Sequence, residues 1–234
     1  MDAKNVFITG GTGYVGRRLA EALVARGHRV RVLARTASVS RVAPGATAIV
    51  GNALDASSYV GGIRPGETIV HLVGTPHPSP AKAAEFQRVD RPSIEAAVAA
   101  ASRSRAGHLV YVSVAHPAPI MKAYIEVRMA GEREIAKARL TATIIRPWYV
   151  LGPGHWWPVL LTPIYFLFGL MPSTREGATR LGLVTIDQMI GTLVAAVENP
   201  PPAGTIREWN VPEIRESGTP GLQNKTRPTN VGKR

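Results

Sequence analysis

Short apolar runs separated by amphipathic stretches recur along most of the chain. Several runs are apolar throughout, as expected of strands that are buried on both faces of a parallel sheet. They predict strands at 6–8, 29–34, 47–50, 68–73, 109–113 and 142–145, with helices from 15 onward, over 81–104 and over 120–138. Strands and helices that alternate at this spacing predict an α/β fold, a Rossmann-type doubly wound parallel sheet.

A glycine-rich turn, Thr9-Gly-Gly-Thr-Gly-Tyr-Val-Gly16, joins the first predicted strand to the first helix. It fits the spacing G-x-G-x-x-G, and also the variant G-x-x-G-x-x-G. Glycines let the backbone approach a pyrophosphate, and the N–H groups of the first helical turn bind that anion. The alternative is a glycine turn without a ligand. We predict that a dinucleotide binds to Gly10, Gly11, Thr12, Gly13, Tyr14, Val15 and Gly16.

The second predicted strand ends at Arg35, where dinucleotide-binding units recognise the adenosine ribose. An acidic residue at this place binds the ribose hydroxyls of NAD, whereas an arginine binds the 2′-phosphate of NADP. The chain has no Asp or Glu between Glu21 and Asp55, and Arg31 and Arg41 lie near Arg35. The sequence therefore favours NADP(H) over NAD(H), unless these arginines are merely exposed at a strand end.

Polar residues at the other strands divide into binding and structural candidates. Asn52 follows the third strand, where an amide can bond an adenine edge, and Gly74 follows the fourth, where bare backbone can approach a cofactor. Asp55 is expected to cap the next helix. The 81–104 helix is expected to be interrupted at Pro92, and Asp90 is expected to cap its second part. His71 lies within a strand and is expected to be a hydrogen-bonded core histidine.

The segment 147–182 is predicted to be an apolar insertion on the substrate side of the sheet. From Pro147 to Thr174 there is no Asp, Glu, Lys or Arg, and the segment holds seven of the chain's fourteen aromatic residues. Two prolines and a length below that of a bilayer span argue against a transmembrane helix. Residues 155–172 can instead form a lid over an apolar substrate, a homodimer face or a membrane-surface contact.

The length is that of one domain, and we expect a dinucleotide-binding domain over 1–212. Leu181 to Ile186 reads as extended chain, 187–198 as a helix, 205–211 as a last strand and 213–234 as a disordered tail. The net charge is +12, but the basic residues are scattered, so we expect no nucleic-acid partner. The chain has no cysteine and only five residues before the first strand, so we expect a cytoplasmic location, and we predict no metal site.

With these motifs the chain resembles the short-chain dehydrogenase/reductase superfamily, in particular its extended and atypical members. It is most similar to the NmrA-like proteins and to the nucleotide-binding accessory subunit of respiratory complex I. The resemblance covers about residues 4–212 and includes Arg146-Pro147 followed by Val150-Leu-Gly-Pro-Gly154. It implies that Ala53, Val73, Ser113, Arg128 and Pro147 also contact the cofactor.

Active members of that superfamily use a Tyr-x-x-x-Lys pair and a serine, and this chain departs from both. Tyr124 and Arg128 have the right spacing for one helix face, but the cation is arginine. The usual hydroxyl position falls at Ala115, two residues after Ser113, and the adjacent His116 can replace it as a proton donor. The resemblance implies a catalytic set of Tyr124, Arg128, Ser113 and His116.

The sequence thus predicts an NADP(H)-binding atypical short-chain oxidoreductase that acts on a small apolar carbonyl compound. Two alternatives stay open. One is a non-catalytic NAD(P)H-binding redox sensor or accessory subunit at a membrane complex, which the altered Tyr124, Arg128 and Ala115 set favours. The other is an NAD(P)-dependent sugar-nucleotide epimerase or dehydratase. The chain is short for such an enzyme, which needs a full lobe to bind the nucleotide sugar.

Overall fold

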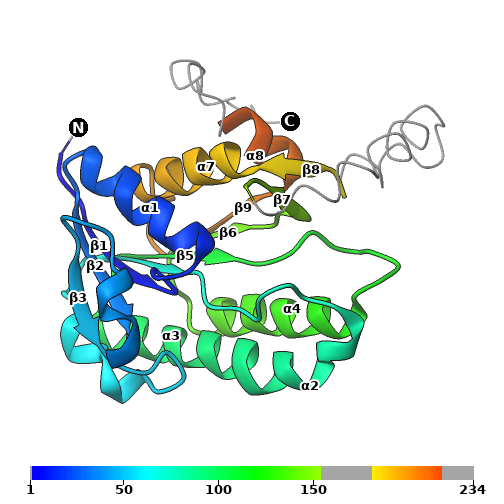
Figure 1. Cartoon of the computed structure of the whole chain (residues 1–234), viewed down its shortest axis with the longest axis horizontal. Helices are drawn as coiled ribbons and strands as arrows, with labels where there is room; N and C mark the ends of the chain where they lie inside the picture. The colour runs from blue at the N-terminus through cyan, green and yellow to red at the C-terminus, as the bar shows by residue number, and fades with distance from the viewer. Residues whose placement is uncertain (1, 154–180, 218–234) are drawn as a thin grey trace, which may run out of the picture.

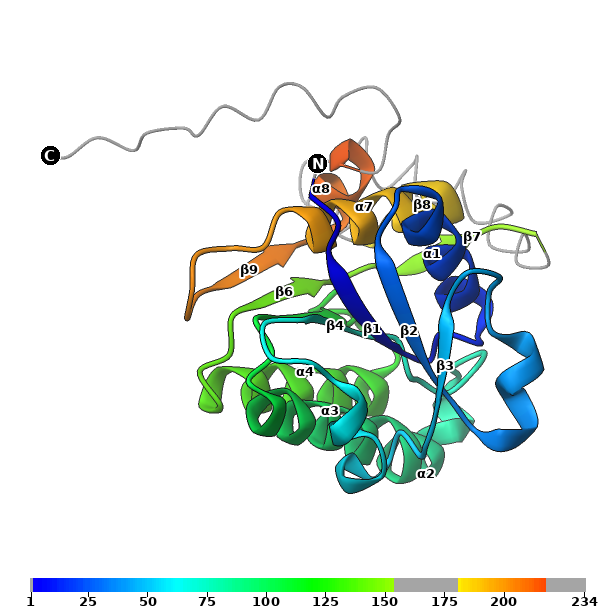
Figure 2. The same ribbon diagram turned by 90° about the vertical axis from the view of Figure 1, so that its left-hand side faces the viewer.

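The computed structural model describes residues 2–153 and 181–217, which form a parallel sheet between two layers of helices (Figures 1 and 2). The sheet has seven strands in the order β3-β2-β1-β4-β5-β6-β9, and every neighbouring pair is parallel. Its strands are β1 (Asn5–Thr9), β2 (Arg29–Ala34), β3 (Thr47–Val50), β4 (Thr68–His71), β5 (His108–Val112), β6 (Ala142–Ile145) and β9 (Ile206–Trp209). The predicted doubly wound Rossmann-type fold is confirmed.

Helices cover both faces of the sheet (Figure 1). One face carries α1 (Tyr14–Ala25), α7 (Ile186–Glu198) and α8 (Val211–Ser217), and the other carries α2 (Ala83–Glu85), α3 (Arg91–Ser104) and α4 (Lys122–Lys137). A separate pair of short parallel strands, β7 (Tyr149–Leu151) and β8 (Leu183–Thr185), follows β6 and precedes α7. No helix of the described residues is long and apolar enough to span a membrane.

The apolar strands divide their side chains between the two helical layers. Successive residues of a strand point to opposite faces, so Val6 and Ile8 of β1 pack with the α1 and α7 layer, and Phe7 packs with the α3 and α4 layer. In β5, Val110 joins the first core and Tyr111 the second. Burial on both faces explains why these runs are apolar throughout and lack the alternation of a half-exposed strand.

Several predicted boundaries are wrong by a few residues. The fourth strand ends at His71 instead of Val73, and the fifth spans His108–Val112 instead of 109–113. Residues 83–104 are helical without a break, through a π-helical turn at Phe86–Asp90. Pro92 lies in the first turn of α3, where the N–H that proline lacks has no helical partner in any case.

Asp90 does not cap α3, contrary to the prediction. Its own backbone is helical, and its carboxylate accepts hydrogen bonds from Thr75 and Arg128. Two other predicted roles are confirmed. Asp55 caps the short turn Ala56–Ser58 by accepting from the Ser57 N–H at 3.0 Å. His71 is a buried core histidine whose ring nitrogens lie 2.8 Å from a Thr9 hydroxyl and 3.3 Å from a Ser93 hydroxyl.

The prediction of a disordered tail from residue 213 is wrong for its first part. Helix α8 continues to Ser217 and buries Val211 and Ile214 against α7. Its Arg215 donates two hydrogen bonds to the Leu183 carbonyl of β8. Residues 218–234, and the apolar segment 155–172 for which we predicted a lid, dimer face or membrane contact, lie outside the described residues.

Candidate functional site

The strand register brings most of the predicted site residues to one edge of the sheet. Thr9 of β1 pairs with His71 of β4, His71 with Tyr111 of β5, and Val112 of β5 with Ile145 of β6. Because all strands are parallel, the residues that follow them share this carboxyl edge, where ligands bind in doubly wound folds. The edge therefore collects Gly10, Arg35, Asn52, Val73, Gly74, Ser113 and Pro147.

The glycine turn between β1 and α1 has room for backbone only. Gly10 has a positive φ of 75°, and a Cβ there would lie 2.8 Å from the carbonyl of Leu72 after β4. A Cβ on Gly16 would lie 2.3 Å from the Gly10 carbonyl oxygen, so the first turn of α1 packs directly on the turn. Gly13 begins α1 without a side-chain cap. These properties fit a pyrophosphate bound by backbone N–H groups.

Tyr14 and Val15, two further residues of the turn, make contacts outside the turn. The guanidinium of Arg18 lies 4.2 Å from the centre of the Tyr14 ring. A Cβ on Gly152 would lie 2.2 Å from the Tyr14 hydroxyl, so the chain after β7 passes closely over the start of α1. Val15 packs against the hydrophobic core. Tyr14 therefore connects the glycine turn to the segment that leads into the apolar insertion.

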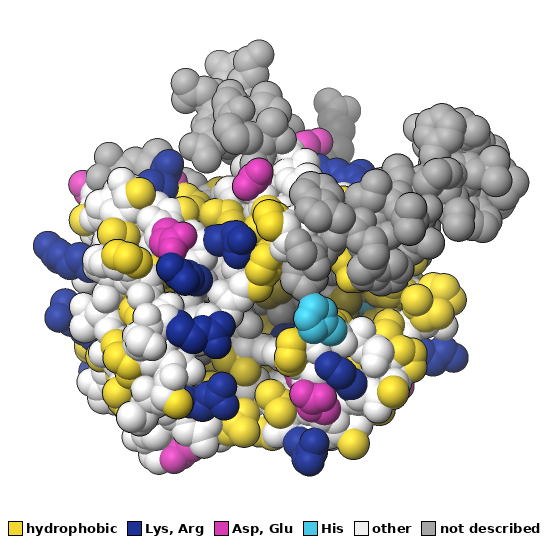
Figure 3. Space-filling model, in the orientation of Figure 1, with side chains coloured by type: hydrophobic (Ala, Val, Ile, Leu, Met, Phe, Trp, Pro, Cys, Tyr) yellow, Lys and Arg dark blue, Asp and Glu magenta, His cyan; other side chains and the backbone are white. Residues whose placement is uncertain are grey.

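Two arginines flank the short helical turn that follows β2. Arg35 is exposed, and its side chain forms no hydrogen bond or ion pair within residues 2–153 and 181–217. Arg41 donates to the Thr12 carbonyl at 3.0 Å, so its guanidinium lies beside the glycine turn. Arg31, in contrast, is paired with the buried Glu67 carboxylate. Figure 3 shows several Lys and Arg side chains on this face, over the half that carries α1.

The segment after β3 forms a compact turn around Asn52. Its Oδ1 accepts from the Leu54 N–H at 3.1 Å, and its own N–H donates to the Ser58 hydroxyl at 2.9 Å. The side-chain amide N–H₂ has no partner among the described residues, so it can still donate to a ligand. Ala53 packs against the core beside it. In this geometry the side-chain N–H₂ of Asn52 can serve as the donor for the predicted adenine contact.

Arg128 is buried beside Gly74 and forms an ion pair that the sequence analysis did not foresee. Its Nη2 lies 2.8 Å from Asp90 Oδ1, and its Nη1 donates to the carbonyls of Val73 and Val112. A Cβ on Gly74 would lie 2.2 Å from Nη2, so Gly74 leaves space for this guanidinium. Burial alone would lower the pKa of Arg128, but the neighbouring Tyr124, Tyr111 and Asp90 raise it above its ordinary value.

Tyr124 lies on the same face of α4 as Arg128, as the spacing predicted. The Arg128 guanidinium lies 5.1 Å from the centre of the Tyr124 ring, within the range of a cation–π contact. The centre of the Phe86 ring lies 5.0 Å from the centre of the Tyr124 ring. Tyr124 is half-buried, and Arg128 supplies a permanent positive charge next to it. Tyr124 and Arg128 therefore lie in contact, while the Arg128 guanidinium is also paired with Asp90.

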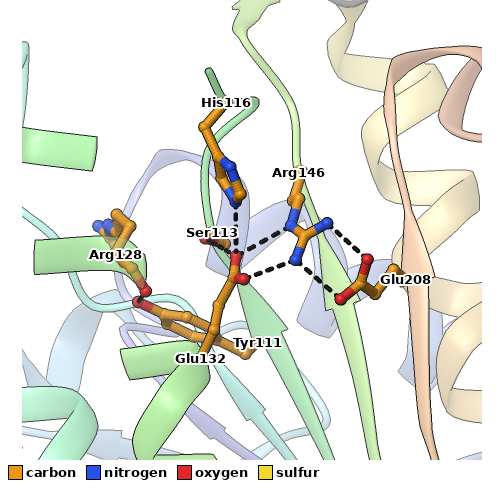
Figure 4. Close-up of polar contacts among 7 residues, drawn as sticks. All are labelled: Tyr111, Ser113, His116, Arg128, Glu132, Arg146 and Glu208. Carbon is orange, nitrogen blue, oxygen red and sulfur yellow. Dashed lines mark hydrogen bonds and ion pairs between the residues drawn. The ribbon is translucent and has the colours of Figure 1, made fainter. Parts of the chain in front are cut away.

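Ser113 and His116 belong to a second polar cluster, centred on the Glu132 carboxylate of α4 (Figure 4). Ser113 Oγ donates to Glu132 Oε1 at 2.6 Å, and His116 Nε2 lies 3.6 Å from the same oxygen. Arg146 donates to both Glu132 oxygens, at 3.0 and 2.6 Å, and also to both oxygens of Glu208. Burial alone would raise the pKa of Glu132, but the hydrogen bonds from Arg146 and Ser113 hold it below its ordinary value.

Sequence reasoning missed Asp90 and Glu132 as site residues. Glu132 follows Arg128 by four positions, so both lie on one face of α4, which was a usable signal. Asp90 carried none, because an aspartate two residues before Pro92 has the sequence pattern of a helix cap. The described residues contain no group of three His, Asp or Glu side chains that could hold a metal ion.

The doubly wound sheet, the glycine turn against α1 and the arginine after β2 together define a dinucleotide-binding protein. The model of a family described as NAD(P)H-binding matches residues 10–152, from the glycine turn to the end of β7. This range is more than half of the chain, so the chain belongs to the NAD(P)H-binding family. The predicted NAD(P)-binding family is therefore confirmed, and the chain also shares its fold with a short-chain dehydrogenase/reductase superfamily protein of Agrobacterium tumefaciens that holds bound NAD, at 16% identity and a TM-score of 0.63 over 88% of this chain and 77% of that one.

Three similar curated proteins have names that describe reductases. The ceramide reductase of Caulobacter vibrioides is 29% identical over 203 residues, which are 85% of this chain and 63% of that protein. The 4-hydroxy-2-methyl-3-oxo-4-farnesyl-3,4-dihydroquinoline-1-oxide ketoreductase of Stigmatella aurantiaca is 29% identical over 62% of this chain and 50% of its own length. The 3-diazoavenalumate denitrifying reductase of a Streptomyces species is 29% identical over 83% and 72%. The chain thus spans less than two thirds of the first two relatives.

Solved structures share the fold at lower identity. The enzyme WbmH of Bordetella bronchiseptica, in complex with NAD+, has a TM-score of 0.64 and 24% identity, over 85% of this chain and 73% of that one. The UDP-N-acetylglucosamine 4-epimerase of Bacillus cereus has a TM-score of 0.65 and 16% identity, over 89% and 79%. At these identities the likeness concerns the fold alone.

Proposed function

We propose that the protein is an NADP(H)-dependent oxidoreductase of the short-chain dehydrogenase/reductase type that acts on the carbonyl group of an apolar molecule. The observation that carries the cofactor preference is Arg35, exposed and unpaired among the described residues at the carboxyl end of β2. An arginine at this place can bind the 2′-phosphate of NADP by charge-assisted hydrogen bonds. Arg41 lies beside the glycine turn and adds a second positive charge to this edge of the sheet.

The bound cofactor would supply or accept the hydride, and the residues of this chain would bind it and handle the proton. The glycine turn binds the pyrophosphate, and Asn52 and Ala53 border the adenine. Val73, Gly74 and Pro147 contact the remainder of the cofactor along the carboxyl edge of the sheet. Tyr124 exchanges the proton with the substrate oxygen, and the Arg128 guanidinium places a permanent positive charge beside its ring. Asp90 keeps the Arg128 guanidinium in place.

The substrate class rests on the relatives and on the sequence of the insertion. Two relatives are named for lipid-like substrates, ceramide and a farnesylated dihydroquinoline oxide. The segment from Pro147 to Thr174 carries no charged side chain, which suits an apolar substrate. A long-chain or prenylated carbonyl compound is therefore the class that we favour.

A second candidate is a non-catalytic NAD(P)H-binding protein, and two contacts favour it. Arg128 is committed to a buried ion pair with Asp90, and the Ser113 hydroxyl donates to Glu132 instead of standing free for a substrate. Ala115 also lacks the hydroxyl that active relatives of the superfamily carry at its position. The epimerase alternative has only the shared fold of distant structures in its support.

An assay of NADPH consumption separates the candidates. Purified protein is mixed with NADPH and with long-chain, prenylated and aromatic aldehydes and ketones, and the absorbance of the reduced nicotinamide is followed. Saturable, carbonyl-dependent oxidation of NADPH supports the oxidoreductase. Binding of NADPH without turnover of any carbonyl in the set supports the non-catalytic protein.

A further inference from the structure

The loop between β5 and α4, here called loop 116–122, exposes apolar side chains at the carboxyl edge of the sheet. Ile120 is 60% exposed, the largest exposed fraction among the bulky hydrophobic side chains of the described residues. Pro117 and Pro119 are exposed beside it, and Met121 joins the loop to α4 at a positive φ of 60°. Because prolines restrict the backbone, the loop can present Ile120 to a partner at a small cost in conformational entropy.

A second loop with exposed apolar residues, loop 75–82 between β4 and α2, lies beside the first. Its last turn, Pro80–Lys82, contacts α4. In Figure 1 both loops run to the right-hand side of the view, next to α2 and the start of α4, and Figure 3 shows hydrophobic side chains at this place. The exposed apolar residues of loop 75–82 are Pro76, Pro78, Pro80 and Ala81.

Both loops carry positive charge. Neither contains Asp or Glu, and each ends in a lysine, Lys82 or Lys122. Lys122 is exposed and forms no hydrogen bond or ion pair with any residue that the structure describes, while Lys82 donates to the Pro76 carbonyl of its own loop. The next acidic residues along the chain, Glu85 and Glu126, come about one helical turn after the lysines. The tips of the two loops therefore combine apolar side chains with cations.

This combination fits the surface of an anionic bilayer. An aliphatic side chain can enter the boundary between headgroups and acyl chains, while lysine ammonium groups stay among the lipid phosphates. The net charge of +12 adds a longer-range attraction to such a surface. Loop 116–122 also lies between Ser113 and Tyr124 in the chain, so this surface adjoins the proposed site.

We propose that loops 75–82 and 116–122 dock the protein on an anionic bilayer, with Ile120 inserted among the headgroups and Lys82 and Lys122 beside the lipid phosphates. The inference rests on the proposed function and deepens it, because an apolar substrate dissolved in the bilayer then reaches the carboxyl edge of the sheet without crossing water. The bilayer is the partner, and no chemical step involves it.

Sedimentation of the full chain with lipid vesicles tests this contact. Vesicles of phosphatidylcholine alone are compared with vesicles that contain equal parts of phosphatidylcholine and phosphatidylglycerol. We expect the protein to bind the anionic vesicles only. Ile120→Glu should weaken this binding about 10-fold or more, because one aliphatic side chain is no longer buried. Lys122→Glu should weaken it about fivefold or more, because a cation near the surface is lost.

Two matched control variants carry the same changes of charge at the far end of the molecule. Ile206 is 37% exposed and begins β9, at the amino edge of the parallel sheet. Lys137 is exposed at the other end of α4 from Lys122. Ile206→Glu and Lys137→Glu should therefore bind the anionic vesicles as the wild type does. Circular dichroism shows that each variant is folded.

Hydrogen exchange on the wild-type protein supplies a readout that needs no variant. Anionic vesicles should slow the exchange of amides in residues 118–122 and leave those of residues 206–209 unchanged. The inference is overturned if the wild type does not bind anionic vesicles, if Ile120→Glu binds them as well as the wild type, if Ile206→Glu weakens binding equally, or if exchange at 118–122 is not slowed.

Calorimetry with NADPH in the absence of vesicles separates this inference from the proposed function. Binding of NADPH by a protein that does not bind anionic vesicles contradicts the membrane contact alone. Binding of the vesicles through Ile120 by a protein that does not bind NADPH contradicts the proposed function and leaves the membrane contact in place.

Discussion

Removal of one partner from the buried ion pair between Asp90 and Arg128 should be strongly destabilising. The Asp90 side chain is 1% exposed and that of Arg128 7%. The carboxylate accepts three hydrogen bonds, from the Thr75 N–H at 3.0 Å, the Thr75 hydroxyl at 2.6 Å and Arg128 Nη2 at 2.8 Å. Asp90→Asn would leave a buried guanidinium without its counter-charge, so it should lower the free energy of unfolding by about 3–5 kcal/mol.

Equilibrium unfolding in urea, followed by circular dichroism, measures this loss. The control is Glu95→Gln, which breaks the exposed Arg91–Glu95 pair of α3 and should cost less than about 1 kcal/mol. In the double variant Asp90→Asn with Arg128→Met the buried charge is gone, so its loss should be smaller than the sum of the two single losses by about 1–3 kcal/mol. If Asp90→Asn costs no more than Glu95→Gln, or if the two single losses add, the buried pair does not hold the site.

Three further predictions concern the chemistry, the glycines and the pH dependence of stability. Tyr124→Phe should reduce turnover about 100-fold or more and leave NADPH affinity unchanged, as steady-state kinetics and calorimetry can show. Gly74→Ala should destabilise the fold in a thermal melt by about 1–3 kcal/mol, because its Cβ would meet Arg128 Nη2. Burial lowers the pKa of His108 to about 4, so the unfolded chain binds its proton first as the pH falls. Stability should therefore decline from about pH 6.5 to about pH 4, and urea titrations at several pH values should show a shallower decline for His108→Asn.

Local patterns were sufficient for the sheet and for the glycine turn. Strands buried on both faces are apolar throughout, and the sequence around Gly10, Gly13 and Gly16 has few other structural explanations. The carboxyl edge then follows from the parallel order, so Arg35 and Asn52 could be placed from the sequence alone. The strand ends could not be placed from the sequence, because hydrogen bonds to the neighbouring strands determine where β4 ends.

The polar clusters of the site depend on contacts between distant parts of the chain. Asp90 looks like a helix cap when only its neighbours in sequence are considered, and it becomes the partner of Arg128 only when α4 packs beside the π-helical turn. Glu132 receives Ser113 and Arg146 from two different strand ends. No periodicity fixes the position of α4 along β5 and β6, so these contacts could not be derived from the sequence.

Calorimetric titration of the protein with NADPH and with NADH tests the central claim most directly. We expect NADPH to bind about 10- to 150-fold more tightly, because a charge-assisted bond to the 2′-phosphate contributes about 1.5–3 kcal/mol. Arg35→Ala should remove most of this difference, while Arg29→Ala, which changes an exposed arginine at the opposite end of β2, should keep it. Equal affinities for the two cofactors, or an unchanged NADPH affinity in Arg35→Ala, would contradict the account.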